Sequence, residues 1–399
     1  MRILTVALVL LLPVLLAMAP EPAKKITRAG AKLDLPFSPA VEADGLIYVA
    51  GAVAFDDTGK IVPGDVKAQT KRTLDNLAGV LKAAGSSIAN VASVNVYLKS
   101  AADFAAMNEV YRTYWPKDPP VRTTIVSTVA APEALIEIAM VAIPNGRERR
   151  VIHPSGWIQS PNPYSYGIKS GNTLFLAGLV ARNGKDNSVV AGDVTVQTKA
   201  VLDNAGEILK AGGMTFADVA SSRIYITDTA MFQAMNAAYR PYFPKDPPAR
   251  ATVRAGLMGP QFVVEITLVA VSGTPKQAIT TPNADGTPGT VNPNLSSAIR
   301  VGNRLYVAGL LGNTDATKGD VKAQTRETLV RIARTLKAAG FEWKDVVDSL
   351  VYLTDVGTFA AMNEAYREVF KADFPARATV QSGLVAPDGL VEIMMTASK

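Results

Sequence analysis

One sequence unit is written three times along this chain, and this repetition constrains the fold more than any other feature. The tripeptide Gly64-Asp65-Val66 returns at 192–194 and again at 319–321. Arg122, Arg250 and Arg377 occupy equivalent places in the three copies and are spaced 128 and 127 residues apart. A period of this length is that of a whole domain and is too long for a solenoid repeat. The 399 residues therefore predict three similar domains.

Each repeat predicts an α+β unit of the order ββαβαββ with its helices on one sheet face. Short apolar runs such as 46–50 indicate buried strands. Apolar residues three or four apart predict a long helix after residue 65, which Asp65 can cap at its start and Gly85 at its end. In the first repeat we expect further strands at 91–98, 122–128 and 135–143, and a second helix at about 103–114.

The last strand of the unit, 135–143, is apolar on both faces. The helices can cover only one face, and an exposed apolar face of this size is rare in monomers. We therefore expect the three sheets to pack together as an intramolecular pseudo-trimer, with no further subunit required. Polar or Gly- and Pro-rich linkers are expected at 144–150 and 272–292. The predicted division is as follows: signal peptide 1–23, and repeats 24–146, 147–274 and 275–399.

The first residues have the pattern of an export signal. Met1-Arg2 is a short basic start, residues 3–16 are apolar apart from Pro13, and 17–19 form a small-x-small cleavage pattern. Pro20 follows directly, which disfavours cleavage at that bond. We expect a secreted or periplasmic protein, anchored at its N-terminus in the membrane only if the signal is not removed.

Composition excludes several kinds of chemistry. The chain has no cysteine and one histidine, so thiolate nucleophiles, cysteine metal sites and a histidine triad in each repeat are impossible. We expect neither a metal nor a cofactor. The net charge of +6 is spread along the chain, without a basic cluster interleaved with aromatic residues, so no nucleic-acid partner is expected.

Two ionisable residues recur at equivalent places in every repeat. One is an arginine after Pro-x, and the other is a glutamate within the apolar last strand; the glutamates are Glu137, Glu265 and Glu392. A glutamate there is costly to bury unless it is paired or protonated. It could brace the fold together with the arginine. Alternatively, the arginine could clamp a carboxylate while the glutamate activates a water molecule. A recurring Asn-x-x-Tyr pattern, which begins at Asn108 in the first repeat, is interpreted as a brace for the loop before the arginine.

In combination, these motifs resemble the Rid (YjgF, reactive intermediate deaminase) family, and the resemblance covers about 370 residues. It rests on strand-Ala-Gly, Gly-Asp-Val-x-x-Gln-Thr, Met-Asn-x-x-Tyr, Pro-x-Arg-x-Thr and Val-Glu-Ile. The resemblance implies a chorismate-mutase-like fold, trimeric packing with clefts between neighbours, and hydrolysis of 2-imino or 2-enamino carboxylates to 2-keto acids and ammonia.

Site roles follow from the same resemblance. The arginines would bind the substrate carboxylate, the glutamates would hold the water, and Tyr164 would be a further catalytic residue. Other substrate-binding positions are three glycines and three threonines: Gly51, Gly178, Gly309, Thr124, Thr252 and Thr379. The family tyrosine is replaced by Phe37 and Leu295 in the other two repeats. The family serine before the glycine is alanine in all three copies, which leaves only the glycine backbone as a donor.

The resemblance therefore predicts a cofactor-independent deaminase of the 2-iminobutanoate or 2-iminopropanoate type. The site around Tyr164 is expected to be its best site, and the three sites are expected to be unequal. Two alternatives remain open, because an exported protein has no evident supply of imines. One is a non-catalytic binding protein for small carboxylates, and the other is a ribonuclease-like activity.

Overall fold

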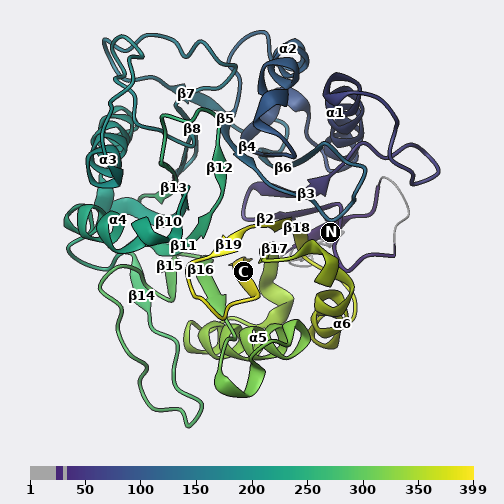
Figure 1. The fold of residues 1–399 in the computed structure, drawn as a ribbon, viewed down its shortest axis with the longest axis vertical. Coiled ribbons are helices and arrows are strands. Elements are labelled where there is room, and N and C mark those ends of the chain that lie inside the picture. The colour runs from purple at the N-terminus through teal and green to yellow at the C-terminus, as the bar shows by residue number, and fades with distance from the viewer. Residues whose placement is uncertain (1–23, 30–33) are drawn as a thin grey trace, which may run out of the picture.

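The three repeats form three units of helices and sheet arranged around a common centre (Figure 1). This computed structural model describes residues 24–29 and 34–399. The predicted signal peptide at 1–23 lies outside the described residues. Within the described ranges, no helix combines the length and the apolar character needed to cross a membrane.

The strands and helices recur in the same order in each repeat. The first repeat contains β1 (Lys25–Thr27), β2 (Ala40–Ala43), β3 (Leu46–Ala52), α1 (Val66–Ala83), β4 (Val91–Leu98), α2 (Phe104–Tyr114), β5 (Val121–Val126) and β6 (Ile136–Ala142). The second contains β7 (Arg150–Ile152), β8 (Gly167–Ser170), β9 (Thr173–Leu176), α3 (Val194–Ala211), β10 (Val219–Ile226), α4 (Phe232–Tyr239), β11 (Ala249–Arg254), β12 (Gly256–Leu257) and β13 (Val264–Val271). The third contains β14 (Gln277–Ile279), β15 (Ala298–Val301), β16 (Arg304–Leu311), α5 (Val321–Ala338), β17 (Val346–Leu353), α6 (Phe359–Val369), β18 (Ala376–Gln381), β19 (Gly383–Leu384) and β20 (Val391–Ser398).

The long helix of each repeat begins where the sequence predicts it. The Asp65 side chain caps α1 by accepting the backbone N–H of Ala68 at 2.9 Å, and Asp193 and Asp320 cap α3 and α5 in the same way. Such a cap satisfies an N–H group that has no partner within the helix. After α1, Gly85 has a φ of +80°, a conformation that glycine adopts without strain. The apolar face of each long helix packs on its own sheet.

Within each sheet, the last strand lies in the middle and carries the recurrent glutamate. In the first repeat the order is β1-β2-β3-β6-β4-β5, with β4 and β5 parallel and the other pairs antiparallel. The other two sheets have the corresponding order. The α+β class and its chorismate-mutase-like arrangement are thus as predicted.

The repeats join at the sheet edges that carry the arginines. Strand β12 of the second repeat pairs with β5 of the first, and β19 of the third pairs with β11 of the second. A bridge between Val129 and Val380 connects the first repeat to β18. Each arginine-bearing edge therefore continues into the next repeat, and the three connections close into a ring.

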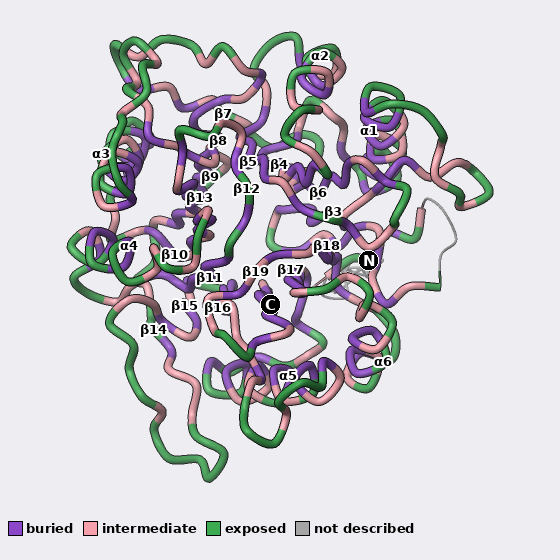
Figure 2. The backbone as a smooth tube through the Cα atoms, in the orientation of Figure 1, coloured by how far each residue is buried: buried purple, intermediate pink, exposed green. Residues whose placement is uncertain are grey.

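The second faces of the three sheets pack against one another around the centre of the ring. One apolar cluster there draws residues from all three repeats and includes Tyr97, Tyr225 and Tyr352. The hydroxyls of Tyr225 and Tyr352 lie 3.0 Å apart. The helices lie outside with their outward faces exposed, while the strands are largely buried (Figure 2). This packing confirms the predicted intramolecular pseudo-trimer and covers the apolar faces that the sequence left unpaired.

The segment expected to be a loop at 272–292 differs in one respect. Strand β14 forms within it and pairs with β15 in register Ala278 to Ile299. The remainder runs outward as an exposed loop, seen below β14 in Figures 1 and 2. The edge of the third sheet supplies hydrogen-bond partners that the polar composition did not reveal.

Candidate active site

The arginine of each repeat lies near the glutamate of the following repeat. We call these pairs site 1 (Arg122 and Glu265), site 2 (Arg250 and Glu392) and site 3 (Arg377 and Glu137). Burial lowers the pKa of each arginine, and the glutamate of its pair, when ionised, acts in the opposite direction. None of the pairs is a direct ion pair: among the described residues, none of these arginine and glutamate side chains has an N···O distance of 4.0 Å or less to its partner. In site 3, both members of the pair line a cavity that can hold a ligand.

Each arginine is buried and held on a platform of two aromatic rings. The exposed fractions are 4% for Arg122, 1% for Arg250 and 3% for Arg377. In each site the guanidinium lies 4.7 to 4.9 Å from the centre of a tyrosine ring and 5.5 to 5.9 Å from that of a phenylalanine. The tyrosines are Tyr111, Tyr239 and Tyr366, and the phenylalanines are Phe104, Phe232 and Phe359. Cation–π contacts of this kind stabilise a buried cation without consuming its N–H donors.

The arginines keep donors without a protein partner. The Nη1 atoms of Arg122, Arg250 and Arg377 are buried and make no hydrogen bond, and neither does Nε of Arg250. A buried cation with free donors is costly, and an anionic ligand would remove that cost. Burial lowers the pKa of all three guanidinium groups, and that of Arg377 to about 10.

The recurrent asparagines accept a hydrogen bond from the arginine in two of the three sites. Nη2 of Arg250 donates to Oδ1 of Asn236, and Nη2 of Arg377 donates to Oδ1 of Asn363, each at 2.7 Å. In site 1, Asn108 instead donates to Asn162 at 3.4 Å, and its own Oδ1 has no partner. The Asn-x-x-Tyr pattern thus orients the arginine itself in sites 2 and 3, whereas the sequence indicated a brace for the preceding loop.

The glutamates lie in the middle strand of each sheet, where burial favours their protonated form. Their exposed fractions are 7% for Glu137, 4% for Glu265 and 2% for Glu392. Burial raises the pKa of all three carboxyls to about 8, against the weaker opposing effect of the facing arginine. In site 1, Oε1 of Glu265 also accepts the backbone N–H of Thr124 at 3.4 Å. An acid with a pKa near the working pH can both give and take a proton.

The recurrent glycines leave room for the glutamates. A Cβ atom added at Gly51, Gly178 or Gly309 would overlap with Oε1 of the glutamate in the same repeat. The backbone N–H of Gly178 donates to the carbonyl of Arg122 at 3.0 Å, so in site 1 this expected donor is already used. Its function there is to join two repeats and leave space for the carboxyl group.

The structure also locates the expected threonines. Thr124, Thr252 and Thr379 are all buried. The backbone N–H of Thr124 also donates to Glu265, as described above. The hydroxyls of Thr252 and Thr379 have no partner, while the backbone of Thr379 acts on the pKa of Glu137 as that of Thr124 acts on Glu265. Thr124 and Thr379 thus face the glutamates of the neighbouring repeats.

Tyr164 belongs to site 1. The next residue, Ser165, donates its backbone N–H to the carbonyl of Pro120, and Ser38 and Ser296 make the corresponding bonds to Pro375 and Pro248. Tyr164, Phe37 and Leu295, each directly before one of these serines, are therefore equivalent, as the sequence alignment proposed. Burial raises the pKa of Tyr164, and the charges of Arg122, Arg182 and Glu265 also act on it.

Site 3 opens into a cavity of about 200 Å³ that contains both members of its pair. Its lining is otherwise apolar except for Thr379. The lining residues are Leu35, Phe37, Gly51, Val53, Phe55, Ala130, Ala131, Glu137, Phe359, Arg377 and Thr379. In the described part of the chain, no group of three or more acidic or histidine side chains is placed to hold a metal ion.

Two sets of residues around the sites were not identified from the sequence. The first is the phenylalanine under each arginine, which recurs three residues before the Met-Asn motif and could have been found by that spacing. The second set consists of side chains on the long helices that donate hydrogen bonds to the loop following the recurrent glycine. Asn76 and Asn204 donate to the carbonyls of Phe55 and Arg182, at 2.9 and 2.5 Å.

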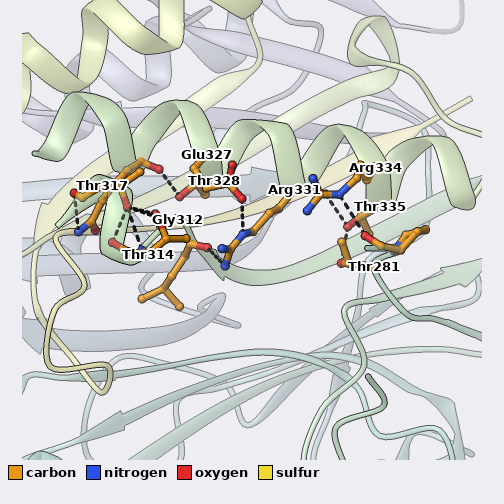
Figure 3. Close-up of polar contacts among 12 residues, drawn as sticks. Thr281, Gly312, Thr314, Thr317, Glu327, Thr328, Arg331, Arg334 and Thr335 are labelled. Carbon is orange, nitrogen blue, oxygen red and sulfur yellow. Dashed lines mark hydrogen bonds and ion pairs between the residues drawn. The ribbon is translucent and has the colours of Figure 1, made fainter. Parts of the chain in front are cut away.

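In the third repeat an arginine replaces this asparagine. Arg331 donates to the carbonyl of Leu311 at 2.7 Å and bonds to Glu327 on the same helix (Figure 3). The loop that follows is closed by Thr317, whose hydroxyl donates to the carbonyl of Gly312 at 2.6 Å. Further along α5, Thr335 bonds to Thr281 of the linker. The loop beside site 2 is therefore built differently from those beside sites 1 and 3.

Fold and sites together define a class: a single-chain pseudo-trimer with an arginine–glutamate site between each pair of neighbouring repeats. The sequence model of the family described as endoribonuclease L-PSP matches residues 31–144, 157–272 and 288–399. The chain belongs to this family, also called Rid or YjgF, as the sequence resemblance predicted, and it contains three copies of the family domain.

Individual relatives correspond either to one repeat or to the whole chain. A RutC family protein from Sulfurisphaera tokodaii is 40% identical over 111 residues, which are 28% of this chain and 89% of that protein. A putative endoribonuclease from Thermotoga maritima is 29% identical, with a TM-score of 0.30, and covers 31% of this chain and 98% of its own. A chorismatase structure covers 88% of this chain and 99% of its own, with 16% identity and a TM-score of 0.52, and so shares the fold. Family membership supports an imine deaminase-like or related function at the level of the family.

Proposed function

We propose that this chain hydrolyses 2-imino carboxylates to 2-keto acids and ammonia at the sites between its repeats. The observation that carries the proposal is the combination, within each site, of a buried arginine with unpartnered donors and a buried glutamate whose pKa is about 8. The first group suits a small carboxylate, and the second suits a reaction in which one proton is both given and returned.

Binding would begin at the arginine. A substrate carboxylate can accept from the free Nη1 donor, because the aromatic rings and the asparagine leave that donor unused. Charge-assisted hydrogen bonds of this kind are about twice as strong as neutral ones. The carboxylate would also fix the neighbouring imine carbon between the arginine of one repeat and the glutamate of the next. Positioning of this kind lowers the barrier for attack by water.

The glutamate would then act as acid and base in turn. In the empty site, burial favours the protonated carboxyl group. It can give its proton to the imine nitrogen, and the iminium carbon becomes more electrophilic. The resulting carboxylate takes a proton from water as the water oxygen bonds to that carbon. The glutamate returns this proton to nitrogen, and as the C–N bond breaks it takes the hydroxyl proton. A 2-keto acid and ammonia leave, and the glutamate is protonated again.

The two alternatives fit these observations less well. A protein that only binds carboxylates would need the arginine but not a glutamate of raised pKa beside it. Ribonuclease activity, to which the description of the family and the name of one relative refer, requires access for a polynucleotide. The cavity at site 3 has a volume of about 200 Å³ and adjoins a hollow of about 840 Å³, a size in the range of small-molecule pockets.

The test is a coupled assay with an amino-acid oxidase that generates imines from a panel of amino acids, while semicarbazide competes for them. Wild type should suppress semicarbazone formation. A triple variant with Gln in place of Glu137, Glu265 and Glu392 should not, although its arginines remain. Carboxylate binding without turnover in wild type would favour the binding-protein alternative, and cleavage of an RNA substrate that the triple variant loses would favour the ribonuclease.

A further inference from the structure

The lining around the catalytic pair differs between the three sites at two equivalent positions. The first is the residue before the serine that bonds to the neighbouring repeat: Phe37 in site 3, Tyr164 in site 1 and Leu295 in site 2. The second lies on the loop after the glycine-bearing strand. In each site these two positions lie beside an arginine–glutamate pair that is the same in all three sites. The residues at the two positions would therefore determine which ligand side chains each site accepts.

The loop position is Phe55 in the first repeat and Arg182 in the second. Their equivalence does not depend on alignment alone. An asparagine of the long helix donates to the carbonyl of each, and each forms an isolated bridge across its loop, to Ile61 and Val189 respectively. Phe55 lines the site 3 cavity, whereas the charge of Arg182 acts on Tyr164 in site 1.

We propose that site 3 selects 2-imino carboxylates with large apolar side chains, such as branched aliphatic or aromatic ones. This inference rests on the proposed function and assigns a substrate class to one of its sites. Among the residues that line the cavity, Arg377 and Glu137 are the ionisable ones. Both are engaged by the common part of the substrate, the carboxylate and the imine.

The rest of the substrate would meet apolar groups. The apolar side chains of the wall are those of Leu35, Phe37, Val53, Phe55, Ala130, Ala131 and Phe359. Burying a side chain of leucine or phenylalanine size gains about 1.5–3 kcal/mol by the hydrophobic effect. A charged side chain would lose its hydration within this cavity. Other charged residues line the larger adjoining hollow of about 840 Å³, which shares Phe37 and Phe55 with the cavity and includes Asp56, Asp57, Arg72 and Asp75. Site 1, with Tyr164 and Arg182 at the two positions, does not share this lining.

The first experiment isolates site 3. A variant with Glu265→Gln and Glu392→Gln keeps Glu137 as the one recurrent glutamate. We expect its kcat/KM for imines derived from leucine and phenylalanine to exceed that for the imine from alanine at least about tenfold, and that from aspartate by more. Adding Phe55→Arg, which copies Arg182 at the corresponding place in the second repeat, should remove most of this preference. Val330→Arg, at an exposed position of α5, is the control in the same background and should leave the preference unchanged.

A binding measurement separates this inference from the proposed reaction. Calorimetry on the wild-type chain compares 4-methyl-2-oxopentanoate with pyruvate, two 2-keto acids that need no turnover. Tighter binding of the branched acid, by at least about tenfold and lost in Arg377→Ala, supports the site 3 assignment even if no imine is hydrolysed. Equal affinities, together with equal kcat/KM values across the imine panel, overturn the assignment and leave the deaminase proposal in place.

Discussion

Glu265 of the second repeat accepts a hydrogen bond from the backbone of Thr124 in the first, with 3.4 Å between N and Oε1. Thr124 stands two residues after Arg122 on the same strand. The carboxyl of one repeat is therefore set against the arginine-bearing strand of its neighbour. Each candidate site is therefore completed by two neighbouring repeats, and no repeat contains both members of a pair.

The glycines beside the glutamates give a first prediction. Gly178→Ala would place a Cβ against Oε1 of Glu265 and displace the carboxyl, so we expect site 1 to lose at least about tenfold in kcat/KM. The measurement is imine hydrolysis in a background where Glu137 and Glu392 are glutamine. Gly79→Ala is the matched control, because a Cβ at Gly79 meets no atom within 4 Å. An unchanged rate in Gly178→Ala would show that the position of the carboxyl does not matter.

Stability should depend on pH through the buried glutamates. The pKa of Glu392 is about 8 in the folded chain and 4.5 as its ordinary value. Between these two pH values the unfolded chain releases a proton that the folded chain keeps, so stability falls as pH rises from about 4.5 to 8. Glu392→Gln removes this contribution. Thermal unfolding should show a variant that gains roughly a few degrees over wild type at pH 8.5 but little at pH 4.5. A constant difference across pH would contradict the raised pKa.

Arg304 should hold the three repeats together more strongly than a surface ion pair does. It is 6% exposed and donates to Asp44 of the first repeat at 2.5 Å and to Thr173 of the second at 2.6 Å. We expect Arg304→Met to lower the free energy of unfolding by about 1–3 kcal/mol, since the partners lose a charged donor. Arg326→Met is the control: Arg326 pairs with Glu368 on the surface, where such pairs contribute about 0–1 kcal/mol. Equal effects of both substitutions in denaturant unfolding would remove the special role of Arg304.

The hypothesis that site 1 is the most active rests on Tyr164. Tyr164→Phe, which copies the residue at position 37, should lower hydrolysis of the imine from alanine about tenfold in a chain where only site 1 is intact, because the hydroxyl is the group that is lost. Phe37→Tyr in a chain with only site 3 intact is the reciprocal change. If all three arginine-to-alanine variants reduce the total rate equally, the sites are equivalent and the hypothesis is wrong.

Much of the fold could be predicted because its causes are local or periodic. The apolar spacing after Asp65 and the glycine at its end specify a helix, and recurrence specifies three copies. The apolar last strand required a second covered face, from which the pseudo-trimer followed. The strand β14 was missed because it forms only where an existing sheet edge offers partners, and the polar sequence around 277–279 has no strand pattern.

The sites were predicted in part for a comparable reason. The arginines and glutamates were found because charged residues in apolar strands are rare. Their pairing across repeats, such as Arg377 with Glu137, depends on the closing of the ring and has no signature in local sequence. Phe55 and Arg182 were missed because their loops vary in length and composition, and only the asparagines that hold them show that the two positions correspond.

The measurement that tests the central claim most directly compares two double variants in the imine assay. Arg122→Ala with Glu265→Gln removes two groups from one site, while Arg122→Ala with Glu137→Gln removes one group from each of two sites. If sites form between neighbouring repeats, the first variant should retain the activity of Arg122→Ala alone, and the second should lose the contribution of site 3 as well. The opposite result would be that the double variant Arg122→Ala with Glu137→Gln has the same activity as Arg122→Ala alone. It would place each site within a single repeat and contradict the account.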